Sequence, residues 1–459
     1  MRKFWGVLVV GLIGLAAPSA LAETLADALI AAYRNSNLLE QNEAVLRAAD
    51  EGVARAVAAL RPVVQYAAAT SWGRSGSDGT FTSRSTGLTT SLSLSASLTL
   101  LDFGRNRLGI AIAEQSVKAT RQSLVGVEQD VLLTAVRAYV DVSLQASIVA
   151  LRESNSRLIA QELQATTDRF DVGEVTRTDV ALAEAALAQA RSGLAAAQGS
   201  FAVAREAYKA ATGKYPGRLA GLPKLPATAK SIEAARDIGL RTHPDILQSQ
   251  ILVKVADLQV ELARAQMAPS LTGSASLSEG SSTDAGGIDS QALSLDFGQT
   301  LYAGGRLSSA LRQAMAQKDQ QRAGLQQAVV LIDQAIGQAW ANIAVSRASI
   351  EAGDQQIRAA QVAFDGVREE AALGARTTLD VLDAEQRLLD ARAGRLEAEA
   401  NLYLAVYQLL SAMGLLTADH LNLGVPSYDV DSYYRAVRNA PAHSPQGEKL
   451  DRILRSIGN

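Results

Sequence analysis

The chain has 459 residues, a formal net charge of −3 at pH 7 and no cysteine. The near balance of charge argues against a nucleic-acid partner. The lack of cysteine excludes disulfides, thiolate metal sites, cysteine nucleophiles and lipidation on an N-terminal cysteine. The length alone suggests about three ordinary domains, but an internal repeat of the chain argues against that division.

The first 22 residues predict a secretory signal peptide. Arg2-Lys3 is a positive start, residues 7–17 are apolar but too short to span a bilayer as a helix, and Ala20-Leu21-Ala22 has the small-x-small pattern of a cleavage site. We therefore expect the mature chain to begin at Glu23. The alternative, a retained anchor, is disfavoured because no stop-transfer pattern follows. After residue 22 no run of about 18 consecutive apolar residues occurs, so membrane insertion would have to use strands.

The rest of the chain contains two copies of one unit. Gly173 to Val180 aligns with Gly374 to Val381, and Gly104 aligns with Gly305, at an offset of about 201 positions. Upstream the offset is about 207, so length varies in one loop only. The predicted organisation is a signal peptide at 1–22, a first repeat at 23–213, a linker at 214–230, a second repeat at 231–414 and a C-terminal periplasmic tail at 415–459.

Each copy shows the same predicted elements in the same order. A short helical stretch is followed by two strands joined by a Gly/Ser/Asp loop, then by a helix of about 65 residues, a glycine turn and a returning helix of about 35 residues. At 1.5 Å per residue the longer helix reaches about 100 Å, which no compact globular domain accommodates. The expected helical ranges are 23–61, 105–170 and 178–211 in the first copy, and 231–267, 306–371 and 379–412 in the second.

Apolar residues recur every seven positions along the long helices, as at Val329, Ile336 and Ile343, and the returning helix from Leu379 alternates steps of three and four. This spacing predicts a coiled coil or a helical tube. On the helices alone, an ordinary soluble coiled coil is the more natural interpretation.

The strand patterns favour a membrane instead. Between Leu88 and Leu100 the even positions other than Thr90 are apolar and the odd positions carry hydroxyls. Leu293, Leu295, Phe297 and Leu301 likewise occupy alternate positions of the matching strand. Trp72 and Tyr302 are expected near strand ends, where interfacial aromatics lie. Strands with one apolar face and one Ser/Thr face are typical of a lipid-exposed barrel with a wet interior. The alternative is an edge of a soluble β-sandwich.

Four strands from one chain cannot close a barrel, and an open edge in lipid leaves backbone groups unpaired. Several copies must therefore close the cylinder together. Three copies give twelve strands, wide enough for an aqueous lumen. The pattern requires closure but does not fix the number three.

These features resemble the outer-membrane efflux protein (TolC) family, and within it the members that serve type I secretion. The resemblance covers nearly all of the mature chain and rests on the duplication and on two tip motifs, Val172 to Val180 and Leu373 to Asp383. It implies a mainly α protein with a membrane β-barrel: a trimeric α/β-barrel duct with four β-strands and long coiled-coil helices per protomer and an internal two-fold sequence repeat. It further implies a cell outer membrane location, extending into the periplasm.

The resemblance also implies the partners. These are two further copies in a homotrimer, a periplasmic adaptor (membrane fusion protein), an inner-membrane ABC or RND transporter and outer-membrane lipid, with no nucleic acid. The family's tips meet the adaptor, so Gly173 and Gly374 are candidate tip turns and adaptor contacts. Local chemistry gives these glycines a simpler role, since each is expected to end a long helix in a left-handed conformation.

Acidic residues at the tips have two interpretations. Thr176-x-x-Asp179 and Thr377-x-x-Asp380 are both capping-box patterns. Asp380 also shares a helix face with Asp383, and a threefold tube would place six such carboxylates around one opening. They would repel anions, attract cations and raise one another's pKa. The family uses aspartates at these two positions as the periplasmic constriction, and capping remains the alternative for Asp380.

The second tip differs from the first in charge. Asp383 corresponds to Leu182, and Arg376 corresponds to Val175. Arg376 resembles the family's latch arginine, which bonds to the neighbouring tip at positions that match Thr178 and Asp179 here. The alternative for Arg376 is a solvated surface charge.

One position departs from the family pattern. The family's type member has a tyrosine, which adds a second link, where this chain has Ala371. The strength of the closed state is therefore left open.

We therefore predict the outer-membrane channel of a tripartite export system: a passive trans-periplasmic duct for type I protein secretion, small-molecule efflux or both, with a gate at its periplasmic tip. No P-loop pattern occurs, and His243, His420 and His443 are isolated, so no enzyme, cofactor or metal site is expected. The alternative is a non-conducting coiled-coil envelope scaffold anchored in the outer membrane. The sequence leaves open whether the cargo is protein, drug or metal ion, which pump is served, and what the tail does.

Overall fold

A computed structural model describes residues 22–77, 83–283, 286–426 and 428–441, and short stretches between 448 and 456. The predicted signal peptide, apart from Ala22, lies outside the described residues. The chain divides into two compact units, each described by itself. Unit 1 comprises residues 1–32, 135–225 and 349–400, and unit 2 comprises residues 33–134, 226–348 and 401–459.

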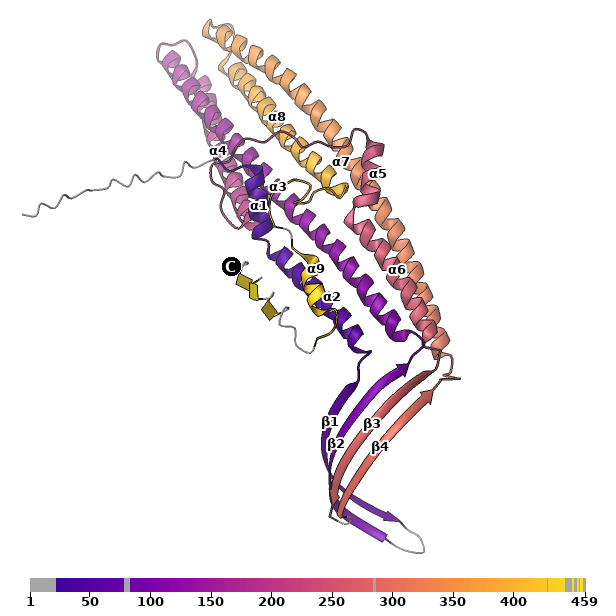
Figure 1. The fold of residues 1–459 in the computed structure, drawn as a ribbon. Helices are drawn as coiled ribbons and strands as arrows, with labels where there is room; N and C mark the ends of the chain where they lie inside the picture. The colour runs from indigo at the N-terminus through magenta and orange to yellow at the C-terminus, as the bar shows by residue number, and fades with distance from the viewer. Residues whose placement is uncertain are drawn as a thin grey trace, which may run out of the picture. The chain divides into compact units, whose positions relative to one another are not determined.

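Unit 2 contains one antiparallel sheet of four strands in the order β1-β2-β3-β4. Four helices meet one end of this sheet, two that lead into it and two that leave it (Figure 1). The strands are longer than the expected length of about 10 residues. Their bounds are Val63–Ser77 for β1, Ser83–Leu101 for β2, Ser270–Ser282 for β3 and Gly286–Gly298 for β4.

The register confirms the predicted division of the sheet into an apolar and a hydroxyl-rich face. Tyr66 pairs with Leu94, which pairs with Leu277 on β3. Because directly paired residues of an antiparallel ladder lie on the same face, the leucine stripe of β2 continues across neighbouring strands. On the other face Ser97 pairs with Ser274, which pairs with Ser294, and the hydroxyls of Ser274 and Ser294 are 2.7 Å apart.

Two details of the strand predictions are wrong. Leu301 lies beyond the end of β4 at Gly298, so it is not a strand residue, whereas Tyr302 lies shortly after that end, as expected. Trp72 lies inside β1, opposite Leu88, rather than near a strand end. The alternation of side chains predicts which face of the sheet a residue occupies. It does not predict where the backbone pairing of a strand ends.

The long helices are close to the predicted ranges. The first long helix, α3, spans Arg105–Asp171 and its counterpart α7 spans Arg306–Ala372, with 67 residues each. The returning helices are α4 at Arg177–Thr212 and α8 at Thr378–Ala412. Both halves of the chain thus follow the same order of helices and strands.

The short helical stretches at the start of each copy are each divided in two. In the first copy, α1 spans Leu25–Arg34 and α2 spans Asn37–Ala58, and the Ser36 hydroxyl accepts a hydrogen bond from the Leu39 amide. In the second copy, α5 spans Ile232–Thr242 and α6 spans Pro244–Ala265. Ser36 caps a new helix and Pro244 cannot continue an old one, so both copies break at the same place.

The C-terminal tail is ordered where the structure describes it. Helix α9 spans Val430–Val437, and its Asp431 carboxylate pairs with Arg121 of α3 at 2.8 Å. The Tyr433 hydroxyl donates to Glu51 of α2 at 2.9 Å. Through α9 the tail therefore packs on α2 and α3.

By length and composition, α3 and α7 are each apolar enough to cross a membrane, whereas the sequence analysis predicted no such helix. The prediction from sequence required an unbroken run of apolar residues. The mean hydropathy of a window can be high even when scattered polar residues interrupt the run. Length and composition are weak evidence, because the core helix of a water-soluble bundle passes the same test.

Candidate functional site

Each of the two tip hairpins in unit 1 turns on a glycine, as predicted. Gly173 has φ 84° and Gly374 has φ 76°, a left-handed region that other residues adopt only with strain. The amide of Glu174 donates to the Arg169 carbonyl at 2.9 Å, and the amide of Ala375 donates to the Glu370 carbonyl at 2.9 Å. This is the Schellman geometry that ends a helix, so each glycine stops a 67-residue helix.

Both predicted capping boxes are present. The Asp179 carboxylate accepts hydrogen bonds from the Thr176 amide at 2.9 Å and hydroxyl at 2.7 Å. The Asp380 carboxylate accepts from the Thr377 amide at 3.0 Å and hydroxyl at 2.8 Å. These hydrogen bonds hold the pKa of both aspartates below the usual value, because they favour the charged form.

Asp380 and Asp383 therefore have different environments within one chain. One oxygen of Asp380 is committed to the start of α8, whereas Asp383 lies exposed one turn further along. The expected rise in the pKa of Asp380 through crowding with other carboxylates is opposed here by the cap. Asp383, which has no counterpart in the first tip, is the carboxylate more available to a constriction.

Arg376 is paired within its own tip. Its Nε donates to Glu370 at 2.8 Å, across the Gly374 turn, and both side chains are about half exposed. The latch that the resemblance implies would bring Arg376 to Thr178 and Asp179 of a neighbouring chain, so Arg376 would have to exchange Glu370 for that contact. The sequence analysis missed Glu370, which lies six positions before Arg376 across the turn.

A second arginine joins the two hairpins of the chain. Arg169, near the end of α3, donates through Nη1 to the Ala371 carbonyl near the end of α7 at 3.4 Å. The last carbonyls of a helix lack intrahelical partners and carry partial negative charge, so a cation there is favourable. The Ala371 side chain is buried among apolar residues of α7 and α8, so this link uses its backbone and requires no particular side chain.

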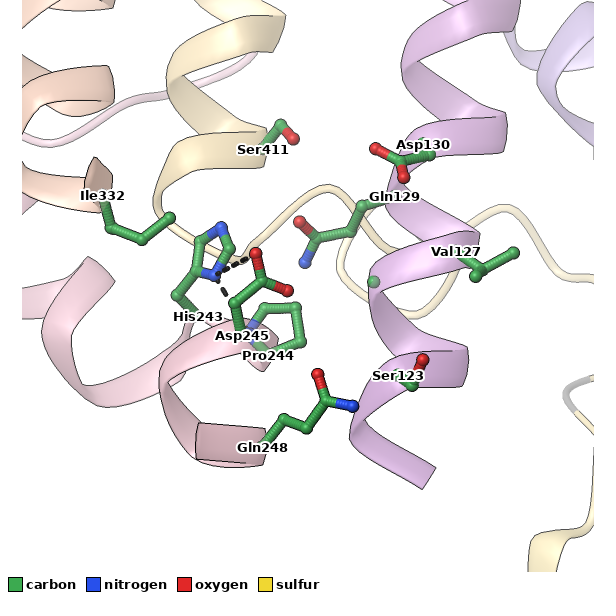
Figure 2. Close-up of a pocket in the computed structure, with 11 residues that line it drawn as sticks. Ser123, Val127, Gln129, Asp130, His243, Pro244, Asp245, Gln248, Ile332 and Ser411 are labelled. Atoms are coloured by element: carbon green, nitrogen blue, oxygen red, sulfur yellow. Dashed lines mark hydrogen bonds and ion pairs between the residues drawn. The ribbon is translucent and has the colours of Figure 1, made fainter. Parts of the chain in front are cut away.

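In unit 2 a polar cavity of about 260 Å³ lies at the break between α5 and α6 (Figure 2). Gln129 of α3 is 3% exposed and extends toward Asp245 of α6. Its Nε2 has no hydrogen-bond partner among the described residues. A polar cavity of this size has room for several ordered waters that would satisfy the amide. The lining residues are Ser123, Gly126, Val127, Gln129, Asp130, His243, Pro244, Asp245, Gln248, Ile332 and Ser411.

His243 in this cavity caps a helix. Its Nδ1 accepts a hydrogen bond from the Asp245 amide at 3.2 Å, in the manner of an N-cap side chain. Burial lowers the pKa of His243, although Asp245 and Asp130 oppose that shift. A neutral imidazole with Nδ1 as acceptor is the form that fits this bond. This bond gives His243 a structural role as a helix cap.

Among the described residues, no group of three or more His, Cys, Asp or Glu side chains is arranged to hold a metal ion. A sequence model of the family described as "Outer membrane efflux protein" matches residues 29–214 and 238–415. The chain belongs to the outer membrane efflux protein family.

Individual relatives agree with this membership. The outer membrane efflux protein BepC of Brucella suis is 36% identical over 428 residues, which cover 93% of this chain and 92% of BepC. The alkaline protease secretion protein AprF of Pseudomonas aeruginosa is 25% identical over 332 residues, which cover 70% of this chain and 68% of AprF. The solved structure of the outer membrane protein VceC from Vibrio cholerae has the same fold, with a TM-score of 0.72 at 22% identity over 85% of this chain and 96% of VceC.

Family membership settles the coarse function. The chain is an outer-membrane efflux channel of the TolC type, and its family is one of channel proteins rather than enzymes. The predicted fold class, with a β-segment for the membrane and long helices for the periplasm, is confirmed. The tips have the predicted local geometry, in which Gly173 and Gly374 end the long helices and Asp179 and Asp380 cap the returning ones.

Proposed function

We propose that three copies of the chain form a passive trans-periplasmic duct of a tripartite export system, closed at rest by the second tip hairpin of each copy. An adaptor binds the tips around Gly173 and Gly374, and an inner-membrane transporter supplies the energy. The cargo is secreted protein, small molecules or both.

The four-stranded sheet carries the assembly part of this proposal. Its outer strands β1 and β4 each have one neighbour, so each leaves a row of backbone groups unpaired. Its leucines are exposed, with Leu293 at 85% and Leu295 at 69%. An apolar face and two open edges in one sheet require lipid on the face and further strands at the edges. Three copies supply twelve strands, which enclose an aqueous lumen.

The gate part rests on the second tip. Asp383 and Arg376 are exposed charges on a hairpin whose backbone is set by Gly374 and Thr377. In the proposed closed state, Asp380 and Asp383 of three copies form the constriction. Arg376 leaves Glu370 and bonds to Thr178 and Asp179 of the next copy.

The proposed cargo is based on the names of two relatives. The name of BepC refers to efflux and that of AprF to protease secretion. A wide bore contacts its cargo unselectively, so one duct can serve both when its tips accept different adaptors.

The test is conduction by the purified full chain. The detergent-solubilised protein should have the mass of three chains and form ion-conducting pores in planar bilayers. A particle that assembles but never conducts would support the scaffold alternative. A detergent-free soluble monomer would contradict both.

A further inference from the structure

The start of α8 lies between two apolar clusters in unit 1. Val381, Ala384 and Leu388 pack against α7. Leu382 packs on the other side against Ile159 of α3 and against α4. Residues 381–388 therefore form a seam that joins the second tip hairpin to the first, and any movement of one hairpin away from the other must separate it.

Glu385 is an ionisable residue placed inside this seam. It is 5% exposed, and its Oε1 accepts a hydrogen bond from Asn155 Nδ2 of α3 at 2.7 Å. Its second oxygen, Oε2, is buried without a hydrogen-bond partner among the described residues. Burying a charged carboxylate with an unpartnered oxygen costs much free energy of solvation, whereas burying the neutral acid costs far less.

The charged groups around Glu385 do not remove this cost. Glu162 of α3 repels the charged form, and Arg368 of α7 attracts it. The residues that α4 contributes to the apolar cluster at the seam are Ala186, Leu187 and Ala190. Burial is the largest influence and, with a smaller contribution from Glu162, raises the pKa of Glu385 to about 7, against the hydrogen bond from Asn155 and the attraction of Arg368.

We propose that Glu385 and Asn155 form a pH-sensitive lock between the two tip hairpins of one chain, tight when Glu385 is protonated and loose when it is ionised. The proposal rests on the gate proposed above, because it assigns that gate a control by proton concentration. Its site differs from the latch, since it joins α8 to α3 within a chain and uses neither Arg376 nor Asp383.

The direction of the effect follows from proton linkage. With the hairpins apart, Glu385 is solvated and ionises near its ordinary pKa of 4.5, whereas in the seam it holds its proton up to about pH 7. Between these values the docked form binds one proton more than the separated form, so the ratio of docked to separated hairpins falls by up to about tenfold for each pH unit of increase. Below the window the lock is fully formed, and above it no further loosening occurs.

The test measures the separation of α3 and α8 directly. Because the chain has no cysteine, Gln161→Cys on α3 and Arg387→Cys on α8 give one pair of spin labels per chain, both at exposed positions. Between pH 5 and 8 the fraction of separated hairpins should rise in the otherwise unchanged protein. Glu385→Gln keeps the acceptor for Asn155 without the charge, so it should hold the pH 5 distance distribution throughout.

Glu397→Gln is the matched control, because it removes the same charge from an exposed position of the same helix. It should respond to pH as the unchanged protein does. Distances that do not depend on pH, or a Glu385→Gln variant that responds like its control, would overturn the proposal. Conductance recorded on the same preparations keeps the two proposals apart: pores with no pH-dependent separation contradict the lock alone, and absence of pores contradicts the duct.

Discussion

The first and second tip hairpins have the same backbone and different charges. In each, a left-handed glycine ends the long helix, and a Thr-x-x-Asp box opens the returning one. The second tip adds Arg376 where the first has Val175, and Asp383 where the first has Leu182. The first tip forms its hairpin without these charges, so hairpin formation does not account for them. They are the part of the second tip that is free to serve a gate.

Removing the latch should produce the largest change. In the double variant Arg376→Ser with Asp179→Ala, the proposed link between neighbouring tips is lost in all three copies. The closed state loses several contacts at once, so we expect a several-fold rise in the mean single-channel conductance in planar bilayers.

Two single variants distinguish the loss of the latch from the loss of a charge at the tips. Arg177→Ser removes an exposed arginine beside the first cap and should leave conductance unchanged. Glu370→Gln removes the partner that Arg376 has within its own tip, so it should favour the link to the neighbour and lower conductance. Conductance of the double variant equal to that of the unchanged channel would contradict the latch.

Two left-handed glycines of the second repeat should differ sharply in their tolerance of a side chain. A Cβ at Gly414 would lie 2.7 Å from the Thr242 carbonyl oxygen and 2.8 Å from His243 Cα, whereas a Cβ at Gly374 meets nothing within 4 Å. Gly374→Ala should therefore cost only the backbone strain, about 1–2 kcal/mol. Gly414→Ala adds overpacking against backbone and should cost about 2–5 kcal/mol.

Thermal unfolding of the two variants in detergent, side by side, measures this difference. Equal melting temperatures would show that the contact between the end of α8 and the start of α6 yields easily. Such a result would contradict the overpacking expected at Gly414.

Exchanging one charge between the tips tests the constriction. Asp383→Asn should lower the preference of the pore for cations over anions, because it removes an exposed carboxylate from each copy. Leu182→Asp places a carboxylate at the matching position of the first tip and should change selectivity less if only the second tip lines the opening. Reversal potentials in a salt gradient give the comparison, and equal effects of both variants would contradict a constriction confined to the second tip.

Much of the tip conformation could be predicted from the sequence, because interactions between residues close in sequence determine it. Gly173, Gly374 and the two Thr-x-x-Asp boxes act through bonds to residues a few positions away, so their spacing is enough to predict their conformation. The alternation of apolar and hydroxyl-bearing residues along β2 likewise predicted which residues share each face of the sheet.

Contacts between elements could not be predicted in this way. The Arg376–Glu370 pair crosses a turn, and Glu385 meets Asn155 across 230 positions of sequence. Glu385 also lies in an acidic and polar stretch of α8 that looks like an exposed face. Only the packing of α3 and α7 around it shows that it is buried.

The helix break before each pair of strands also differs between the two copies. Ser36 caps α2 in the first copy, and His243 caps α6 at the corresponding position of the second, since the offset upstream of the strands is about 207. A serine cap works at any pH, whereas the imidazole cap requires a neutral Nδ1. The second copy should therefore have a pH dependence at this joint that the first copy lacks.

The smallest expected effect concerns this cap. Burial lowers the pKa of His243 from 6.5 in the folded protein, so the unfolded chain binds a proton more readily, and the contribution of the cap is complete above pH 6.5 and declines as the pH falls below it. His243→Ala should cost about 1 kcal/mol at pH 8. His243→Ser places the residue of the first copy at this joint, so it should retain most of that stability and also remove the decline at acid pH. Unfolding of the three proteins followed at pH 8 and pH 5.5 tests this, and a serine variant that weakens with acid as much as the parent would place the pH dependence elsewhere.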